Sequence, residues 1–308
     1  MSDDIYRMIT EEQAAANSST PEAEAPFDKE AWAAEKQAER DQVYGRIDAA
    51  TQRISDDPTE FRDYLDVMAR FPRYSVANTL LIHDQSPEAT RLGDFDSWKS
   101  RGASVKKGES AIAILEPGDE YTKPDGSIGI SYNVKKVFDA RQTSARHLEP
   151  RYPEIREALR ALISNSPVAV KPVEASLGAT DAHYDHATQT ISIVKGLNEQ
   201  ELFKALVVEM AHAELAATEG VYDRDAQAED AQLVGYVVAK RNGVDVSDRM
   251  PALSPCLEDG DLQDVRGQLG RVRDGAKEIT DRMNKTLDAD KGDSTKQKAP
   301  NRSSRDAR

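Results

Sequence analysis

Residues 73–82 read Arg-Tyr-Ser-Val-Ala-Asn-Thr-Leu-Leu-Ile, directly after Pro72, and this stretch decides the fold of the first half of the chain. A proline followed by a polar start and a run of apolar side chains predicts a helix over residues 75–82. Two further helices are predicted before it, over residues 28–54 and 57–68, because apolar side chains recur there near helical spacing.

The segment after this helix changes in character. Short apolar runs bounded by Gly and Pro predict strands over residues 111–115 and 128–138, and Lys123-Pro-Asp-Gly126 between them predicts a turn. The first half therefore predicts a helical layer with a small antiparallel sheet.

The second half is rich in helical patterns. Helices are predicted at residues 154–163, 199–218, 226–241 and 262–287, and strands at residues 168–173 and 189–194. Together the two halves predict an α+β fold.

The chain has 308 residues, enough for about two domains. Its hydrophobic fraction of 38% is low, so part of the chain is not expected to pack. We expect a disordered acidic arm (1–27), a first domain (28–146), a second domain (147–250), a C-terminal helix (251–288) and a disordered basic tail (289–308). The sequence has neither a long apolar run nor a basic start followed by an apolar core, so we expect a cytoplasmic protein with no membrane segment.

The net charge of −14 at first argues against a nucleic-acid partner. The charge is unevenly distributed, however, because residues 98–146 hold nine basic and six acidic side chains, a net +3. A local basic patch acts over about a Debye length, ~8 Å at physiological salt, so the total charge does not exclude an anionic partner.

Basic and aromatic side chains alternate between residues 73 and 142. Cations neutralise the phosphates of a single strand, and exposed rings stack on its unpaired bases. A structural alternative is that Tyr74 and Trp98 are core residues and that Lys106-Lys107 lies in a solvated turn. The candidate DNA-binding residues are Arg73, Tyr74, Asn78, Trp98, Lys106, Lys107, Lys135 and Lys136.

This stretch resembles the N-terminal domain of ArdC-type antirestriction proteins, which include LtrC-like proteins. The segments that carry the resemblance, in chain order, are Tyr74–Ile82, Pro87–Arg91, Trp98, Gly102, Val105–Glu109, Pro117 and Lys136–Thr143. The resemblance implies a single-stranded-DNA-binding domain in a plasmid- or mobile-element-encoded protein that protects incoming DNA.

ArdC-type proteins pair this domain with a zincin-like metallopeptidase domain, whose helix carries the motif HExxH. Two His one turn apart bind Zn²⁺, and the Glu is the general base. The corresponding helix of this chain contains Val208-Glu209-Met210-Ala211-His212, so Val208 replaces the first His. The resemblance therefore implies a helix-rich zincin-like domain that is degenerate as a metallopeptidase.

A catalytic zinc site takes three protein ligands and a water. Residues 228–239 resemble the helix that supplies the third ligand of the family, where Glu229 and Asp230 are the available acids. His183, His186 and Glu214 are further possible ligands. We expect no cofactor; zinc held by His212, Glu229 and Asp230, with Glu209 as the base, belongs to the alternative of an active site with rearranged ligands.

The sequence thus predicts a non-catalytic protein that binds single-stranded DNA and protects incoming DNA, with conjugation or mobile-element proteins as possible partners. One alternative is a zinc-dependent metallopeptidase with a rearranged ligand set. The other is an acidic DNA mimic that inhibits a nuclease, which the acidic segments 1–60 and 147–290 suggest.

Overall fold

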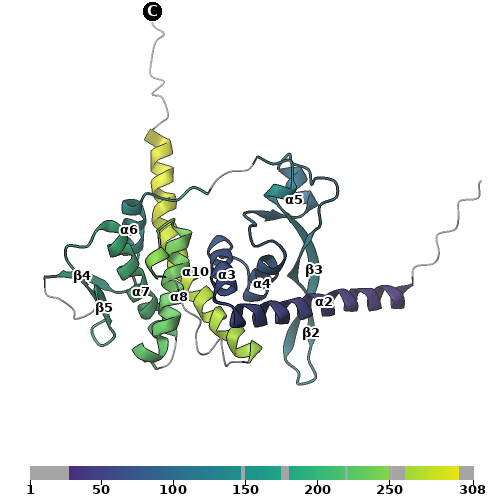
Figure 1. The fold of residues 1–308 in the computed structure, drawn as a ribbon, viewed down its shortest axis with the longest axis horizontal. Helices are drawn as coiled ribbons and strands as arrows, with labels where there is room; N and C mark the ends of the chain where they lie inside the picture. Colours follow the sequence, from purple (N-terminus) through teal and green to yellow (C-terminus); the bar gives the residue numbers. More distant parts are fainter. Residues whose placement is uncertain are drawn as a thin grey trace, which may run out of the picture. The chain divides into compact units, whose positions relative to one another are not determined.

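The structure is a computed structural model that describes residues 28–146, 150–174, 180–218, 221–249, 251 and 261–297 (Figure 1). The predicted disordered arm and residues 298–308 of the predicted tail lie outside the described residues. The chain divides into two compact units, Met1–Asp41 and Gln42–Arg308. Helix α2 (Lys29–Asp56) begins in the first unit, and its buried side chains begin at Val43 in the second.

Two capped helices follow α2, as predicted. The Asp57 side chain accepts a hydrogen bond from the Thr59 amide at the start of α3 (Pro58–Arg70). The Ser75 hydroxyl accepts one from the Asn78 amide at the start of α4 (Val76–Gln85). Each cap satisfies a backbone donor that the first helical turn leaves free.

A three-stranded antiparallel sheet lies beside these helices. Its order is β1 (Leu92–Gly93), β3 (Ile128–Asp139) and β2 (Ile112–Thr122). β2 extends beyond the predicted strand to Thr122, with a register shift between Pro117 and Glu120. Two short helices not predicted from the sequence join this sheet, namely α5 (Phe95–Ser100) and η1 (Ala140–Gln142).

Two side-chain amides of α4 bond the outer edge of β2. The Asn78 amide nitrogen donates to the Leu115 carbonyl (2.8 Å), and its oxygen accepts from the Leu115 amide (2.7 Å). Gln85 makes the same pair of bonds with Ala113, both at 2.9 Å. The two amides thus replace a neighbouring strand at the base of the hairpin.

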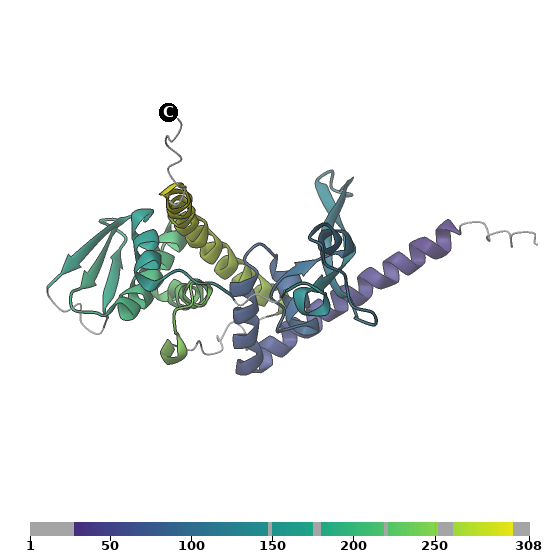
Figure 2. The same cartoon turned by 90° about the horizontal axis from the view of Figure 1, so that it is seen from above.

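The second half begins with α6 (Ile155–Ser164) and a mixed sheet. In this sheet β6 (Thr190–Val194) lies between parallel β4 (Ala169–Val173) and antiparallel β5 (Ala182–Asp185). The strands lie beside α6 and α7 (Glu199–Thr218), as Figure 2 shows.

Three elements complete the chain: α8 (Arg224–Arg241), η2 (Ser247–Arg249) and α10 (Leu262–Gln297). α10 continues nine residues past the predicted end at 288, so residues 289–297 are helical where a disordered tail was predicted.

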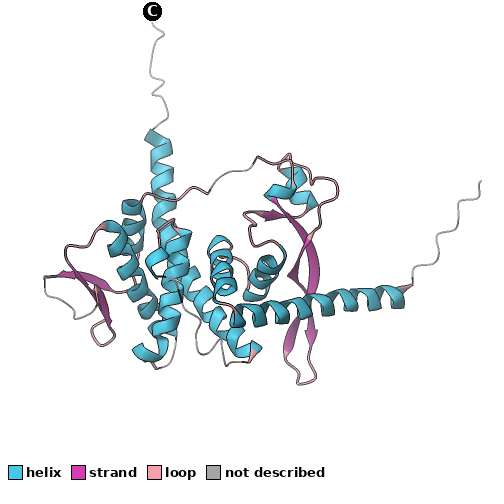
Figure 3. Cartoon of the chain, viewed as in Figure 1, coloured by secondary structure: helices cyan, strands magenta, loops and turns pink. Residues whose placement is uncertain are grey.

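One hydrophobic core runs through both halves of the second unit. It includes Ile54 of α2, Phe61 of α3, Leu80 of α4, Phe203 of α7 and Val272 of α10, all completely buried. The fold is α+β, as predicted, with helices predominating and the strands gathered in two separate sheets (Figure 3). Within the described ranges, no helix is both long and apolar enough to cross a membrane.

Candidate nucleic-acid interface and the α7 centre

Trp98, a candidate for base stacking, points from α5 into a small hydrophobic core. Its ring is only 1% exposed, and its indole nitrogen donates to the Phe138 carbonyl at 2.9 Å. Gly93 lies so close that a Cβ there would be 3.1 Å from the indole nitrogen. A ring held in this way cannot stack on a base, so the structure gives Trp98 the structural role that the sequence left open.

Asn78 and Tyr74 also have internal contacts. Asn78 is buried and has both ends of its amide bonded to Leu115. Tyr74 is half-buried with its ring edge-on to Phe71, and burial raises the pKa of its phenol. The Asn78 side chain therefore has no free hydrogen-bonding group for a DNA strand, whereas Tyr74 remains partly accessible.

The predicted cations differ in how far they are engaged. Lys135 forms ion pairs with Glu116 (3.0 Å) and Asp94 (3.2 Å), and Lys106 donates to the Arg141 carbonyl. The hydrogen bond from the Ser97 amide, together with Lys135, lowers the pKa of Asp94 to about 2. Arg73 and Lys107 are exposed and form no ion pair with any described residue, and Lys136 is exposed as well.

The structure adds residues that the sequence did not single out. We call Phe95, Lys99, Arg101, Lys106 and Lys107 the α5 surface, because all five are exposed on segments that pack around Trp98. Phe95 is 61% exposed and leans on Phe138, with ring centroids 4.7 Å apart. Two acids, Asp96 and Glu109, are exposed beside them. A solvent-facing aromatic ring among cations is a pattern that suits the binding of single-stranded nucleic acid.

Arg91 and Arg101 lie against the same buried ring. Their guanidinium carbons are 5.1 and 5.3 Å from the Trp98 ring centroid. Each gains a cation–π contact of the order of 0.5–1 kcal/mol at such exposed sites. The buried Trp98 therefore serves the surface indirectly, by holding two arginines that have no carboxylate partner among the described residues.

A second constellation surrounds Glu209 on α7, and we call it the α7 centre: Glu209, His212, Arg224, Tyr222, Tyr184 and His186. The Glu209 carboxylate is buried and receives both arms of the Arg224 guanidinium, at 2.7 and 2.9 Å. It also accepts a hydrogen bond from the Tyr184 amide at 2.6 Å. A carboxylate bound in this way is neutralised and held in place by its own chain.

His212 lies one turn away from Glu209 and is also buried. Its Nδ1 lies 3.2 Å from the Tyr222 hydroxyl, and burial lowers the pKa of the imidazole to about 4, with a smaller contribution from the Arg224 charge. The rings of Tyr184, His186 and Tyr222 contact one another, and the ring centroids of His186 and Tyr222 are 4.9 Å apart. His212 is therefore neutral at physiological pH and part of an aromatic cluster.

Val208, which stands where HExxH has its first His, packs between helices. A Cβ at Gly235 of α8 would lie 2.7 Å from Cγ2 of Val208, so only glycine allows this close approach. The apolar side chain at this position makes a helix–helix contact.

The other candidate ligands are paired elsewhere. Asp230 accepts hydrogen bonds from Gln268 and Arg271 of α10, each at 2.8 Å, and Glu214 pairs with Arg282. His183 and His186 are exposed, and Glu229 is half-buried with an interaction of its own. In the part of the chain that the structure describes, no three His, Cys, Asp or Glu side chains are placed to hold a metal ion. The residues present do not fit a zinc site of the HExxH type.

Arg224 was not foreseen in the sequence. The signal was indirect: a Glu on the buried face of a helix needs a compensating charge. No spacing rule identifies Arg224 as that charge, since it lies 15 residues away on the next helix.

Comparison with known protein families identifies a domain in the first half of the chain. Residues 34–148 match the N-terminal domain of anti-restriction factor ArdC. The chain is 23% identical over 290 residues to an uncharacterized protein of Bacillus anthracis, covering 75% of this chain and 49% of that protein; it thus spans about half the length of this relative.

Two crystal structures of the antirestriction protein ArdC from plasmid R388 are similar at 14% identity and a TM-score of 0.45. The metal-free structure covers 77% of this chain and 97% of that one, and the Mn(II)-bound structure covers 69% and 84%. The resemblance found in the sequence is confirmed over the matched domain: residues 34–148 belong to the family of N-terminal domains of anti-restriction factor ArdC.

Proposed function

We propose that this protein binds single-stranded DNA through the α5 surface, and that it acts in antirestriction by coating incoming DNA, without catalysis. The observation that carries the proposal is the match of residues 34–148 to the N-terminal domain of an anti-restriction factor. The exposed cations on that domain, which the net charge of −14 conceals, support it.

We choose the residues proposed to contact the DNA strand by their exposure and by the contacts that they already make. Arg101, Lys99 and Lys107 are exposed and form no ion pair with any described residue, so they can neutralise phosphates without breaking an existing contact. Phe95 takes the stacking role first assigned to Trp98, and the partly accessible Tyr74 keeps the one assigned to it. Arg73 and Lys136 remain candidates, whereas Asn78 is excluded by its bonds to β2.

Fluorescence anisotropy with a labelled 20-nucleotide strand tests the proposal. Binding is expected for the single strand in preference to the duplex, with little sequence preference. It should weaken steeply with salt, by a logarithmic slope of ~0.7 for each phosphate contacted. The double variant Arg101→Ser/Lys107→Ser should lose about tenfold in affinity at low salt.

Lys171→Ser/Lys285→Ser is the matched control, because both lysines are exposed in the second half of the chain and form no ion pair with any described residue. An equal loss in this control would mean that total charge and not the α5 surface governs binding. Absence of binding to the single strand at low salt would refute the proposal itself.

The α7 centre does not support the metallopeptidase alternative. Glu209 is held by Arg224, and the residue at the first-His position is Val208. No contact of the described residues singles out an acidic surface as a DNA mimic, and competition for a purified restriction nuclease by excess DNA would separate mimicry from strand coating.

A further inference from the structure

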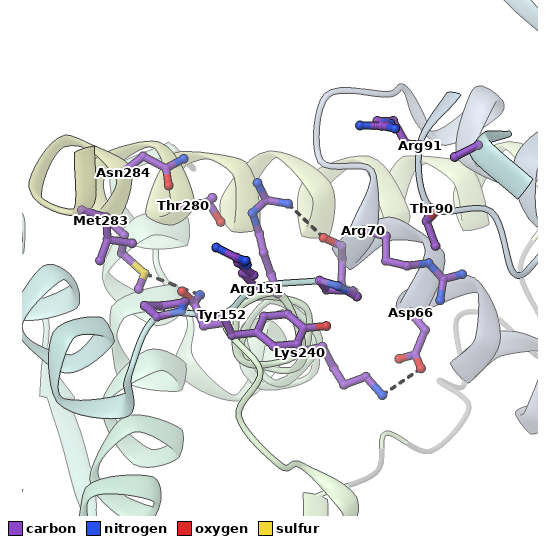
Figure 4. Close-up of a pocket in the computed structure, with 17 residues that line it drawn as sticks. Asp66, Arg70, Thr90, Arg91, Arg151, Tyr152, Lys240, Thr280, Met283 and Asn284 are labelled. Carbon is purple, nitrogen blue, oxygen red and sulfur yellow. Dashed lines mark hydrogen bonds and ion pairs between the residues drawn. The ribbon is translucent and has the colours of Figure 1, made fainter. Parts of the chain in front are cut away.

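A cavity of about 570 Å³ lies among α3, α8, α10 and the segments 90–91 and 150–153. Its lining residue Arg91 also contacts the Trp98 ring, whereas no residue of the α7 centre lines it. In Figure 4, Met283, Thr280 and Asn284 of α10 lie on one side, Asp66, Arg70 and Arg91 lie on the other, and Arg151 and Tyr152 lie between them. This volume falls within the ~300–1,000 Å³ that small-molecule sites typically have.

The cavity walls carry an excess of positive charge. Five cations line the cavity, and Asp66 is the one carboxylate among the lining residues. Asp66 is already bonded to Lys240 at 2.8 Å. The four remaining cations are Arg70, Arg91, Arg151 and Arg241.

None of these four arginines has a carboxylate partner within the described ranges. Arg241 donates to the Ala69 carbonyl at 3.1 Å, and Arg70 donates to the Pro87 carbonyl. The Nε of Arg70 is buried with no hydrogen-bond partner among the described residues. Asp281 acts on Arg241 at longer range but is itself bonded to Lys277, and burial lowers the pKa of Arg241. An anion bound among these guanidinium groups would offset their mutual repulsion.

The cavity is larger than an inorganic anion needs, and it offers a flat apolar platform. The Tyr152 ring rests on Gly243, where a Cβ would lie 2.5 Å from the ring carbon Cγ. Gly243 has a φ of +73°, so a larger residue there is strained in any case. One face of the ring is thus covered, yet the side chain is 52% exposed. Met283 and Leu287 add apolar surface nearby.

We propose that this cavity binds a nucleotide by its 5′-phosphate, with the arginines holding the phosphate oxygens and Tyr152 stacking on the base. Guanidinium forks match phosphate oxygens in pairs, and a tyrosine ring stacks on any base. The same chemistry is offered by a free nucleotide and by the phosphorylated 5′ end of a DNA strand. Binding of a strand end presupposes the proposed function, whereas binding of a free nucleotide does not.

Calorimetry on the full chain tests the phosphate requirement. Thymidine 5′-monophosphate is expected to bind at least tenfold more tightly than thymidine. Arg151→Ser and Arg91→Ser, both at exposed positions, should each reduce this preference at least fivefold, whereas Lys171→Ser should leave it unchanged.

A second comparison tests the base contact. Deoxyribose 5-phosphate should bind more weakly than thymidine 5′-monophosphate, and Tyr152→Ser should abolish the difference. If the two ligands bind equally to the unaltered protein, the assignment to a nucleotide is overturned.

A third experiment distinguishes a free nucleotide from a phosphorylated strand end as the ligand. A 12-nucleotide strand with a 5′-phosphate is compared by anisotropy with the same strand bearing a 5′-hydroxyl. A preference for the phosphorylated strand that disappears in Arg151→Ser assigns the site to strand ends, and binding of the mononucleotide in calorimetry assigns it to free nucleotides. The proposal is refuted if phosphate confers no preference in either form, or if the preference survives both arginine substitutions. Mononucleotide binding without any strand binding would refute the proposed function and leave the cavity assignment standing.

Discussion

The α7 centre and the α5 surface treat charge in opposite ways. In and around the α7 centre, the buried acids Glu209, Asp230 and Glu214 each meet an arginine of another segment. On the α5 surface, Lys99, Arg101 and Lys107 face solvent without any such partner among the described residues. A buried charge without a partner is costly, whereas an exposed one is not. The buried acids are therefore committed to partners within the fold, and the unpaired cations are available to a ligand.

The largest loss of stability is expected for Arg224→Met, which leaves the Glu209 carboxylate buried and uncompensated. Removing one partner of a buried ion pair costs about 3–5 kcal/mol, and a loss of this size is expected in urea unfolding. The double variant Glu209→Gln/Arg224→Met should recover most of it, because no charge is then buried. A loss below about 1 kcal/mol in the single variant would show that the pair is not sequestered.

The next test uses pH. Because the folded state holds the pKa of His212 at about 4, down from 6.5, the unfolded chain binds the proton first as the pH falls. The stability that His212 contributes is thus fully present above pH 6.5 and is lost progressively towards pH 4, by at most about 3 kcal/mol. The difference in unfolding free energy between the protein and a His212→Gln variant should therefore change across this window. A constant difference would contradict the burial of a neutral imidazole.

A smaller effect is expected where the ArdC-type domain itself buries polar groups. Asn78→Leu removes two hydrogen bonds and leaves the amide and carbonyl of Leu115 without partners, which should cost about 2 kcal/mol in urea unfolding. Tyr74→Leu, which loses no hydrogen bond between described residues, is the control. If the two variants lost equal stability, the bonds to β2 would carry no special weight.

The smallest effect on stability should come from the α5 surface. Lys107→Ser should change the free energy of unfolding by less than about 0.5 kcal/mol, because the side chain is exposed and has no ion-pair partner among the described residues. In strand binding it should reduce the logarithmic salt slope by about 0.7, the contribution of one phosphate. A measurable loss of stability with an unchanged slope would reverse the assignment of Lys107.

How well the sequence predicted the structure depended on the range of the interactions. Helices such as α3 and α7 follow from local spacing and caps, which are written in neighbouring residues. The burial of Trp98 could not be read locally, since it depends on Phe138 and Gly93. The same holds for Arg224, whose role exists only because α8 brings it to Glu209, and for the four arginines of the cavity, which come from distant segments.

The pairing of α4 with β2 has a consequence for assembly. A hairpin edge of this length would ordinarily be a template on which another chain could add a strand. At its base the backbone groups of Ala113 and Leu115 are already occupied by Gln85 and Asn78. Further along, Pro117 has no amide hydrogen to offer, and the register shift up to Glu120 interrupts the regular edge. The β2 edge of this long hairpin is thus a poor template for self-association.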